Sequence, residues 1–214
     1  GPGAAAAAPE VERAVTAIWQ AERAQRKDLF DGTLFSVERF SAGRIFGRFV
    51  PYRYLTAQRA RPALFESLRV RPLAVSGVLT CEGGVVFGRR AEGLADDAGK
   101  WELAPSGRVD IQATESAVGG TTRVNLGRQI MAELGEELGL KNGDISAMEI
   151  FCAVEDGTSH TFAIGIALSS SLAAEDLRVR QARGRGAEYA EIRVVASDKV
   201  PEFAAGLGDE LTPA

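Results

Sequence analysis

The segment from residue 126 to residue 140 constrains the fold more than any other part of the chain. Its apolar residues recur at helical spacing and form one stripe along a helix. Asn125 is a residue type that caps helices, and Gly139 supplies a stop signal. We therefore predict a helix over residues 126–138. The stripe consists of Leu126, Ile130, Met131, Leu134 and Leu138.

Three acidic residues share another face of this predicted helix. Glu133, Glu136 and Glu137 are spaced i, i+3 and i+4, which brings their Cβ atoms within roughly 5–6 Å of one another. Like charges this close raise one another's pKa, and a divalent cation would relieve them. Because the apolar stripe faces elsewhere, we expect these acids to lie outside the core. A solvated acidic helix face is the alternative interpretation.

The rest of the chain alternates between strand-like and helical patterns, which favours an α/β (α+β) sandwich with a mixed sheet. An N-terminal helix and a C-terminal helix frame the strands. Pro51 predicts that the residues after it form an edge strand, and residues 59–72 are predicted to be a basic connector with a short helix. The predicted strands lie within 33–56 and at 73–80, 85–89, 101–104, 148–154, 162–168 and 191–196. The predicted helices cover 11–30 and 63–68, and a last one begins at 201. Residues 111–124 are predicted to be a loop.

Composition excludes several classes of protein. The chain has 25 Lys+Arg against 29 Asp+Glu, a net charge of -4 and 45% hydrophobic residues, all ordinary globular values. An acidic chain is not expected to be a stable partner of nucleic acid. No apolar run reaches the ~20 residues of a membrane span, and no signal peptide is visible. Two cysteines, Cys81 and Cys152, cannot form a disulfide framework, so we expect free thiols and a cytoplasmic location.

Histidine and arginine usage narrows the chemistry. With one histidine, His160, any metal site must use carboxylates, which points to Mg²⁺ or Mn²⁺. Between Arg39 and Arg71 there are eight arginines and one acid, Glu66. Arginine forks fit phosphate oxygens, so this segment is expected to attract a phosphorylated anion; an arginine-rich solvated surface is the alternative.

The residues around the acidic helix resemble the signature of the Nudix hydrolases. Its closing half, in which Glu133 comes first and Glu136, Glu137, Gly139 and Leu140 follow, is matched in register. Upstream, the segment Trp101-Glu102-Leu103-Ala104-Pro105-Ser106-Gly107 and the hairpin ending in Arg89-Arg90 are also similar to the family. The resemblance covers roughly residues 73–210 and is strongest in these motifs.

Two departures from the Nudix signature stand out. Ala132 replaces the arginine that normally precedes the first glutamate and helps to orient the acids. Gly107 lies 26 residues before Glu133, whereas the family's pattern places it 15 before, so an insertion of 11 residues is expected in this loop. The insertion hides the middle glutamate of the signature, for which Glu115 is a candidate, and Arg128 is a candidate substitute for the missing arginine. An inserted box of this kind is weakly similar to the branch that cleaves nucleotide sugars.

The resemblance implies a site and an activity. Gly107, Glu133, Glu136 and Glu137 would bind Mg²⁺ or Mn²⁺, and the three glutamates would be the catalytic residues. The implied reaction is hydrolysis of the diphosphate bond of a nucleoside diphosphate linked to another moiety. A Nudix-fold module that binds a nucleotide without turnover is the alternative. The implied substrate-binding residues are Arg53, Arg89, Arg90 and Trp101. For Trp101, a place in the hydrophobic core is an equally good interpretation. The candidates for the general base are Glu155, Glu188 and Glu191.

The predicted organisation has three parts. Residues 1–9 are expected to be a disordered tag or tail, residues 10–72 an N-terminal extension of helix and strands, and residues 73–214 the Nudix-like catalytic domain. The expected partner is a small-molecule diphosphate substrate, with no membrane partner, and a homodimer is left open.

Overall fold

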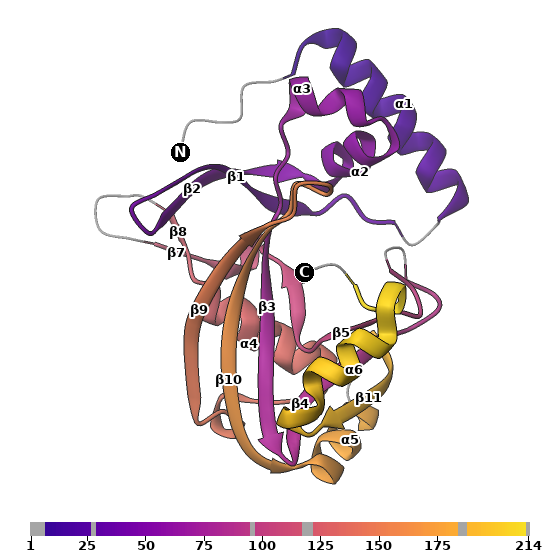
Figure 1. Ribbon diagram of the computed structural model, residues 1–214. Coiled ribbons are helices and arrows are strands. Elements are labelled where there is room, and N and C mark those ends of the chain that lie inside the picture. The colour runs from indigo at the N-terminus through magenta and orange to yellow at the C-terminus, as the bar shows by residue number, and fades with distance from the viewer. Residues whose placement is uncertain (1–6, 27–28, 95–96, 117–121, 184–187, 213–214) are drawn as a thin grey trace. The chain divides into compact units, whose positions relative to one another are not determined.

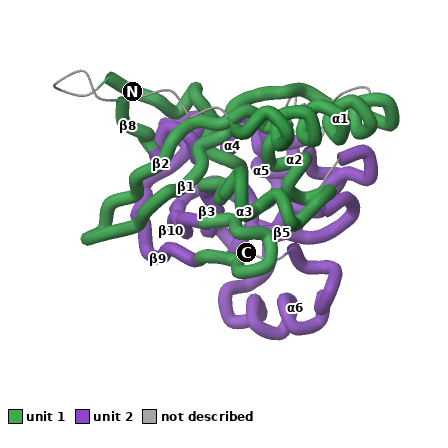
Figure 2. Tube along the Cα trace, turned by 90° about the horizontal axis from the view of Figure 1, so that it is seen from above, with its two compact units in different colours: residues 1–73, 108–125, 155–162 green, residues 74–107, 126–154, 163–214 purple. Residues whose placement is uncertain are grey.

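A computed structural model of the chain describes residues 7–26, 29–94, 97–116, 122–183 and 188–212. Two compact units emerge, coloured separately in Figure 2. Unit 1 comprises residues 1–73, 108–125 and 155–162, and unit 2 comprises residues 74–107, 126–154 and 163–214. Of the predicted tail, residues 1–6 lie outside the described residues, and the first helix begins at Pro9. None of the helices formed by the described residues is long and apolar enough to cross a membrane.

Unit 1 is built from helices and a hairpin. Helix α1 packs against α2, and the Trp19 ring meets Tyr52 edge-on with centroids 6.5 Å apart. Strands β1 and β2 lie within the predicted strand region 33–56 and pair antiparallel around a turn at Ala42 and Gly43. The elements are α1 (Pro9–Gln25), β1 (Thr33–Ser41), β2 (Arg44–Pro51), α2 (Tyr52–Ala60), α3 (Phe65–Leu68), β7 (Thr114–Ser116) and β8 (Thr122–Val124). Its core contains Val15, Leu34, Val50, Leu55, Leu68 and Val70.

Two sequence-based expectations in unit 1 were wrong. The chain does not continue as an edge strand after Pro51; it enters α2, because proline is well tolerated just before a helix and Leu55 and Ala57 find buried positions there. The predicted loop at 111–124 instead contains the short antiparallel hairpin β7–β8. Its residues are too polar and too few to produce a visible alternating pattern.

Unit 2 contains a sheet of seven strands with the order β11-β4-β3-β10-β9, in which β5 also pairs with β4 and β6 with β3 (Figure 1). Inward-facing residues of β3, such as Val75 and Leu79, alternate with more exposed ones, as expected for a strand. The strands are β3 (Leu73–Glu82), β4 (Gly84–Arg90), β5 (Trp101–Leu103), β6 (Ser106–Arg108), β9 (Ala147–Glu155), β10 (Phe162–Ala173) and β11 (Tyr189–Val195).

Helices cover this sheet on both faces. In Figure 1, α4 lies behind the strands and α6 in front of them. On the α6 side, Phe203 packs edge-on against Phe87 and Trp101, with ring centroids 5.0 and 5.8 Å apart. The helices of unit 2 are α4 (Leu126–Leu138), α5 (Ala174–Arg183) and α6 (Val200–Leu207). Short 3-10 helices occur at Pro62–Leu64, Ile111–Ala113, Asn142–Asp144, Ser197–Lys199 and Gly208–Glu210.

Candidate active site

Helix α4 has the bounds that the sequence predicted, residues 126–138. Ile130, Leu134 and Leu138 are fully buried, so the apolar stripe anchors the helix to the core. Gly139 then adopts a positive φ of 67°, which favours glycine and ends the helix.

The three glutamates of α4 do not share one environment. Glu136 is exposed and Glu133 is half-buried, but Glu137 is only 1% exposed. The expectation that all three acids lie outside the core was therefore wrong for Glu137. It follows Glu136 by one residue, which turns it about 100° around the helix and towards the sheet.

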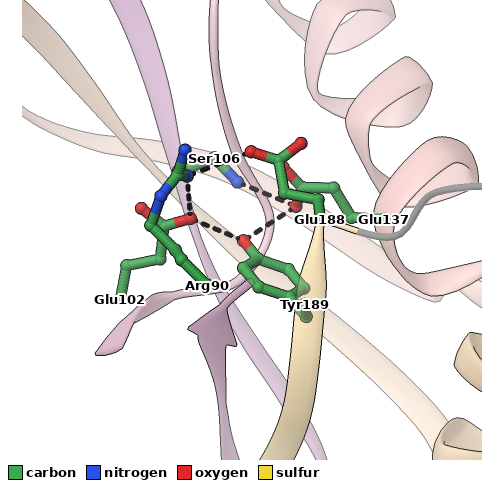
Figure 3. Close-up of polar contacts among 6 residues, drawn as sticks. All are labelled: Arg90, Glu102, Ser106, Glu137, Glu188 and Tyr189. Atoms are coloured by element: carbon green, nitrogen blue, oxygen red, sulfur yellow. Dashed lines mark hydrogen bonds and ion pairs between the residues drawn. The ribbon is translucent and has the colours of Figure 1, made fainter. Parts of the chain in front are cut away.

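Glu137 is held by two hydrogen bonds to one of its oxygens (Figure 3). Its Oε2 accepts from the backbone N–H of Ser106 at 3.2 Å and from the Tyr189 hydroxyl at 3.0 Å. Among the described residues, its buried Oε1 has no hydrogen-bond partner. Burial raises the pKa of Glu137 well above its ordinary value; the carboxylate of Glu188 adds to the increase, and the hydrogen bond from Tyr189 opposes it.

Glu133 is fixed by a neighbour on its own helix. Its Oε1 accepts from Nε2 of the buried Gln129 at 2.7 Å, an i−4 contact. Its carboxylate also fills the space beside Gly107, where a Cβ atom would overlap it. The position of the missing arginine, Ala132, is exposed. Gln129 therefore supplies one hydrogen bond that orients the first glutamate, and its place one turn before Glu133 is the signal that sequence reasoning overlooked.

Arg90 joins Glu102 of β5 to Glu188, the residue just before β11 (Figure 3). Its Nη1 lies 2.8 Å from Oε1 of Glu102 and 3.0 Å from Oε1 of Glu188. Burial alone would lower the pKa of Arg90, but Glu102 and Glu188 raise it above its ordinary value, so the guanidinium stays charged. Burial raises the pKa of Glu188, and Arg90 opposes that increase. The Tyr189 hydroxyl, 2.9 Å from Oε1 of Glu102, connects this pair to Glu137.

The remaining predicted residues have different positions. Arg89 is exposed on β4, where its Nε donates to the carbonyl of Gly99 at 3.1 Å. Trp101 is 4% exposed and packs with Phe87, which favours the core role over a stacking surface. Arg53 belongs to unit 1, where its Nη1 pairs with Asp31 at 2.8 Å. Its role in binding substrate stays a prediction.

The other candidates for catalytic acids make different contacts. Glu191 pairs with Arg193 at 2.9 Å on the exposed side of β11. Glu155 and Glu115 both belong to unit 1. Glu155 pairs there with Arg71 at 2.6 Å, and Glu115 accepts from the Asn125 amide at 3.0 Å. Of the predicted general bases, Glu188 alone joins the hydrogen-bonded network of Arg90, Glu102, Ser106, Glu137 and Tyr189 (Figure 3).

The donors around α4 suit a hard cation in kind. In the part of the chain that the structure describes, no group of three or more His, Cys, Asp or Glu side chains is arranged so that it could hold a metal ion. However, the unpaired, buried Oε1 of Glu137 is a carboxylate oxygen that lacks the partner such a group needs. A second carboxylate, Glu133, packs directly on the backbone of Gly107. These oxygen donors fit Mg²⁺ or Mn²⁺.

Comparisons with known proteins address the fold. No family model and no curated protein matches the chain. Among solved structures it is similar to DR0079 from Deinococcus radiodurans, with a TM-score of 0.50 and 16% identity over 81% of this chain and 90% of that chain. It is also similar to a Nudix hydrolase from Nitrosomonas europaea, with a TM-score of 0.37 and 16% identity over 81% of this chain and 78% of that one. A third match is a bifunctional NMN adenylyltransferase/ADP ribose pyrophosphatase from Francisella tularensis, with a TM-score of 0.39 and 12% identity over 74% of this chain and 48% of that one.

At these identities the comparisons speak to the fold. The predicted α/β (α+β) fold with a mixed sheet is confirmed, and a Nudix hydrolase is among the solved structures to which the chain is similar.

Proposed function

We propose that the chain is a Mg²⁺- or Mn²⁺-dependent hydrolase that cleaves the diphosphate bond of a nucleoside diphosphate linked to another moiety. The observation that carries the proposal is Glu137, a buried carboxylate whose Oε2 is held by Ser106 and Tyr189 while its Oε1 has no hydrogen-bond partner among the described residues. Burying an ionised carboxylate in this way costs free energy unless a proton or another counter-charge is supplied. A divalent cation at Oε1 would supply the counter-charge.

The residues proposed to hold the ion are Glu133, Glu136 and Glu137, with the backbone carbonyl of Gly107. Because the described acids are not gathered around one point, binding of the ion would have to draw these carboxylates together. A bound Mg²⁺ or Mn²⁺ neutralises charge on diphosphate oxygens and lowers the pKa of a coordinated water. The protein contributes rigidity: Gln129 fixes Glu133, and the network around Arg90 fixes Glu137. Glu136 stays exposed on the same helix, where substrate has access to it.

Two further roles are proposed for residues of unit 2. Arg89 is exposed and would contact a phosphate, whereas Arg90 is committed to Glu102 and Glu188. Glu188 is the proposed general base, because burial raises its pKa towards the range in which a carboxylate accepts a proton effectively near neutral pH.

A second function rests on Ala132. Position 132 is exposed and is an alanine, whereas the Nudix signature that this segment resembles has an arginine there. The missing guanidinium favours a module that binds a nucleotide diphosphate without hydrolysing it. The two functions require the same fold and differ only in turnover.

A substrate panel tests the proposal. The purified chain is incubated with ADP-ribose, a UDP-sugar, a dinucleoside polyphosphate, coenzyme A and an isoprenoid diphosphate, each with Mg²⁺, with Mn²⁺ and with EDTA. Metal-dependent cleavage of at least one diphosphate, abolished by EDTA, is expected. Calorimetric binding of a panel member with no cleavage under any condition would establish the binding module instead, and neither binding nor cleavage would reject both functions.

A further inference from the structure

We infer that Tyr189 is a positioning residue: its hydroxyl ties Oε2 of Glu137 to the Glu102–Arg90 pair and so presents Oε1 to the divalent cation. The inference rests on the proposed function, because it assigns a role within the proposed metal site. It concerns a residue that lies 52 positions from Glu137 along the chain and outside every motif recognised in the sequence.

The local backbone geometry of β11 and β4 fixes the position of the Tyr189 side chain. The register between β11 and β4 shifts between Tyr189 and Glu191, and such a bulge redirects a side chain from its regular position. The ring then lies over Gly88, where a Cβ atom would come within 2.5 Å of two ring carbons. Tyr189 is 3% exposed, so its ring has little freedom to move.

The hydrogen-bonding capacity of a phenol explains the arrangement. Its oxygen lies 2.9 Å from Oε1 of Glu102 and 3.0 Å from Oε2 of Glu137 (Figure 3). A phenol carries a single proton, so it donates to one of these two carboxylates at a time. Glu102 already has a counter-charge in Arg90, at 2.8 Å. Glu137 has no ion pair of its own among the described residues. The hydroxyl therefore lies between a neutralised acid and the acid that still needs a cation.

These contacts fix the orientation of the Glu137 carboxylate. Tyr189 and the Ser106 N–H both engage Oε2, which leaves Oε1 as the open donor. Partners that orient a metal ligand typically change metal affinity or activity by about 10- to 100-fold when they are removed. Without the phenol oxygen, Glu137 keeps only the Ser106 contact and gains rotational freedom.

The test compares two Tyr→Phe variants. Tyr189→Phe keeps the ring over Gly88 and deletes only the hydroxyl. Tyr54→Phe is the matched control, because Tyr54 also donates to a carboxylate, Glu12, but does so in unit 1. Mn²⁺ binding is measured on each variant by electron paramagnetic resonance without substrate, and kcat and KM are measured with the best diphosphate of the panel. Tyr189→Phe is expected to weaken Mn²⁺ binding about 10-fold or more and to lower kcat with little change in KM, while Tyr54→Phe matches the wild type.

A second variant disturbs the contact between Tyr189 and Glu137 without changing either residue. Gly88→Ala crowds the ring and displaces the hydroxyl while Tyr189 itself is kept, so it should weaken Mn²⁺ binding in the same direction. If the wild type binds Mn²⁺ and both variants bind it equally well, Tyr189 only fills space and the inference is overturned while the proposed function stands. If the wild type binds no Mn²⁺ and cleaves no diphosphate, the proposed function fails and the inference fails with it.

Discussion

The carboxylate of Glu133 occupies the space in which any residue other than glycine at position 107 would carry its Cβ atom. Gly107 belongs to β6 and Glu133 to α4, and 26 residues separate them along the chain. Two halves of the motif are thus in direct contact despite the inserted segment between them. The insertion therefore leaves this contact of the site intact.

Substituting Gly107 by alanine should displace the Glu133 carboxylate. A shift of ~1 Å in a catalytic group can cost about 10²-fold in rate, and we expect a loss of that order in kcat/KM together with weaker Mn²⁺ binding. The control is Gly93→Ala, also in unit 2, where a Cβ atom would meet nothing within 4 Å. Full activity of Gly107→Ala would show that Glu133 does not need its present position.

Glu136→Gln should abolish most activity without affecting stability. Glu136 is exposed, so the substitution removes a charge from the proposed metal site but no packing. We expect kcat to fall by roughly 10²-fold or more, with an unchanged melting temperature. Glu202→Gln, an exposed acid on α6, serves as the control. Wild-type metal-dependent turnover in Glu136→Gln would remove this residue from the site.

Arg90→Met should destabilise the fold, since it leaves Glu102 and Glu188 without their shared counter-charge. Removing one partner of a buried ion pair typically costs about 3–5 kcal/mol of unfolding free energy. Arg89→Met is the matched control: its pair with Glu92 spans 3.8 Å at an exposed position and should contribute at most ~1 kcal/mol. Urea unfolding of both variants near pH 7 measures the difference, and equal midpoints would contradict the prediction.

The metal-free protein should lose stability as pH rises. Burial raises the pKa of Glu137 in the folded state, so folding favours its protonated form. This contribution is complete below the pKa of an unfolded glutamate, about 4.3, and is lost as pH increases through the raised value. In EDTA, Glu137→Gln should therefore be more stable than the wild type at alkaline pH, with a flatter pH dependence. Burial raises the pKa of Glu188 as well, so some dependence should persist. Parallel stability curves for the two proteins would refute this account.

Much of the architecture was accessible from local sequence patterns. Helix α4 has a strong apolar stripe and a glycine stop, and its bounds were predicted correctly. The hairpin of β3 and β4, predicted as strands at 73–80 and 85–89, was also found. Helix α2 was missed because its buried face is short and its start lies next to Pro51. Local periodicity carries information about an element only when the element is long enough to repeat.

The candidate site was predictable only in part. The register of the three glutamates came from one helix, but the burial of Glu137 depends on residues of other elements. Tyr189 lies 87 positions from Glu102, and no spacing rule connects such residues. Their meeting is set by the sheet order, which places β11 next to β4 and β5 on its other side. Sequence reasoning thus proposed the acidic residues of α4 as ligands and missed the groups that contact them.

The two tryptophans of the chain belong to different units. Trp19, 9% exposed, packs in unit 1 against Tyr52, and Trp101, 4% exposed, packs in unit 2 against Phe203. Each unit therefore carries a single tryptophan, whose emission can be excited selectively over that of tyrosine. Emission from Trp19→Phe reports on unit 2 alone, and emission from Trp101→Phe reports on unit 1 alone. Denaturation followed through these two variants would reveal whether the halves of the molecule unfold together or in succession.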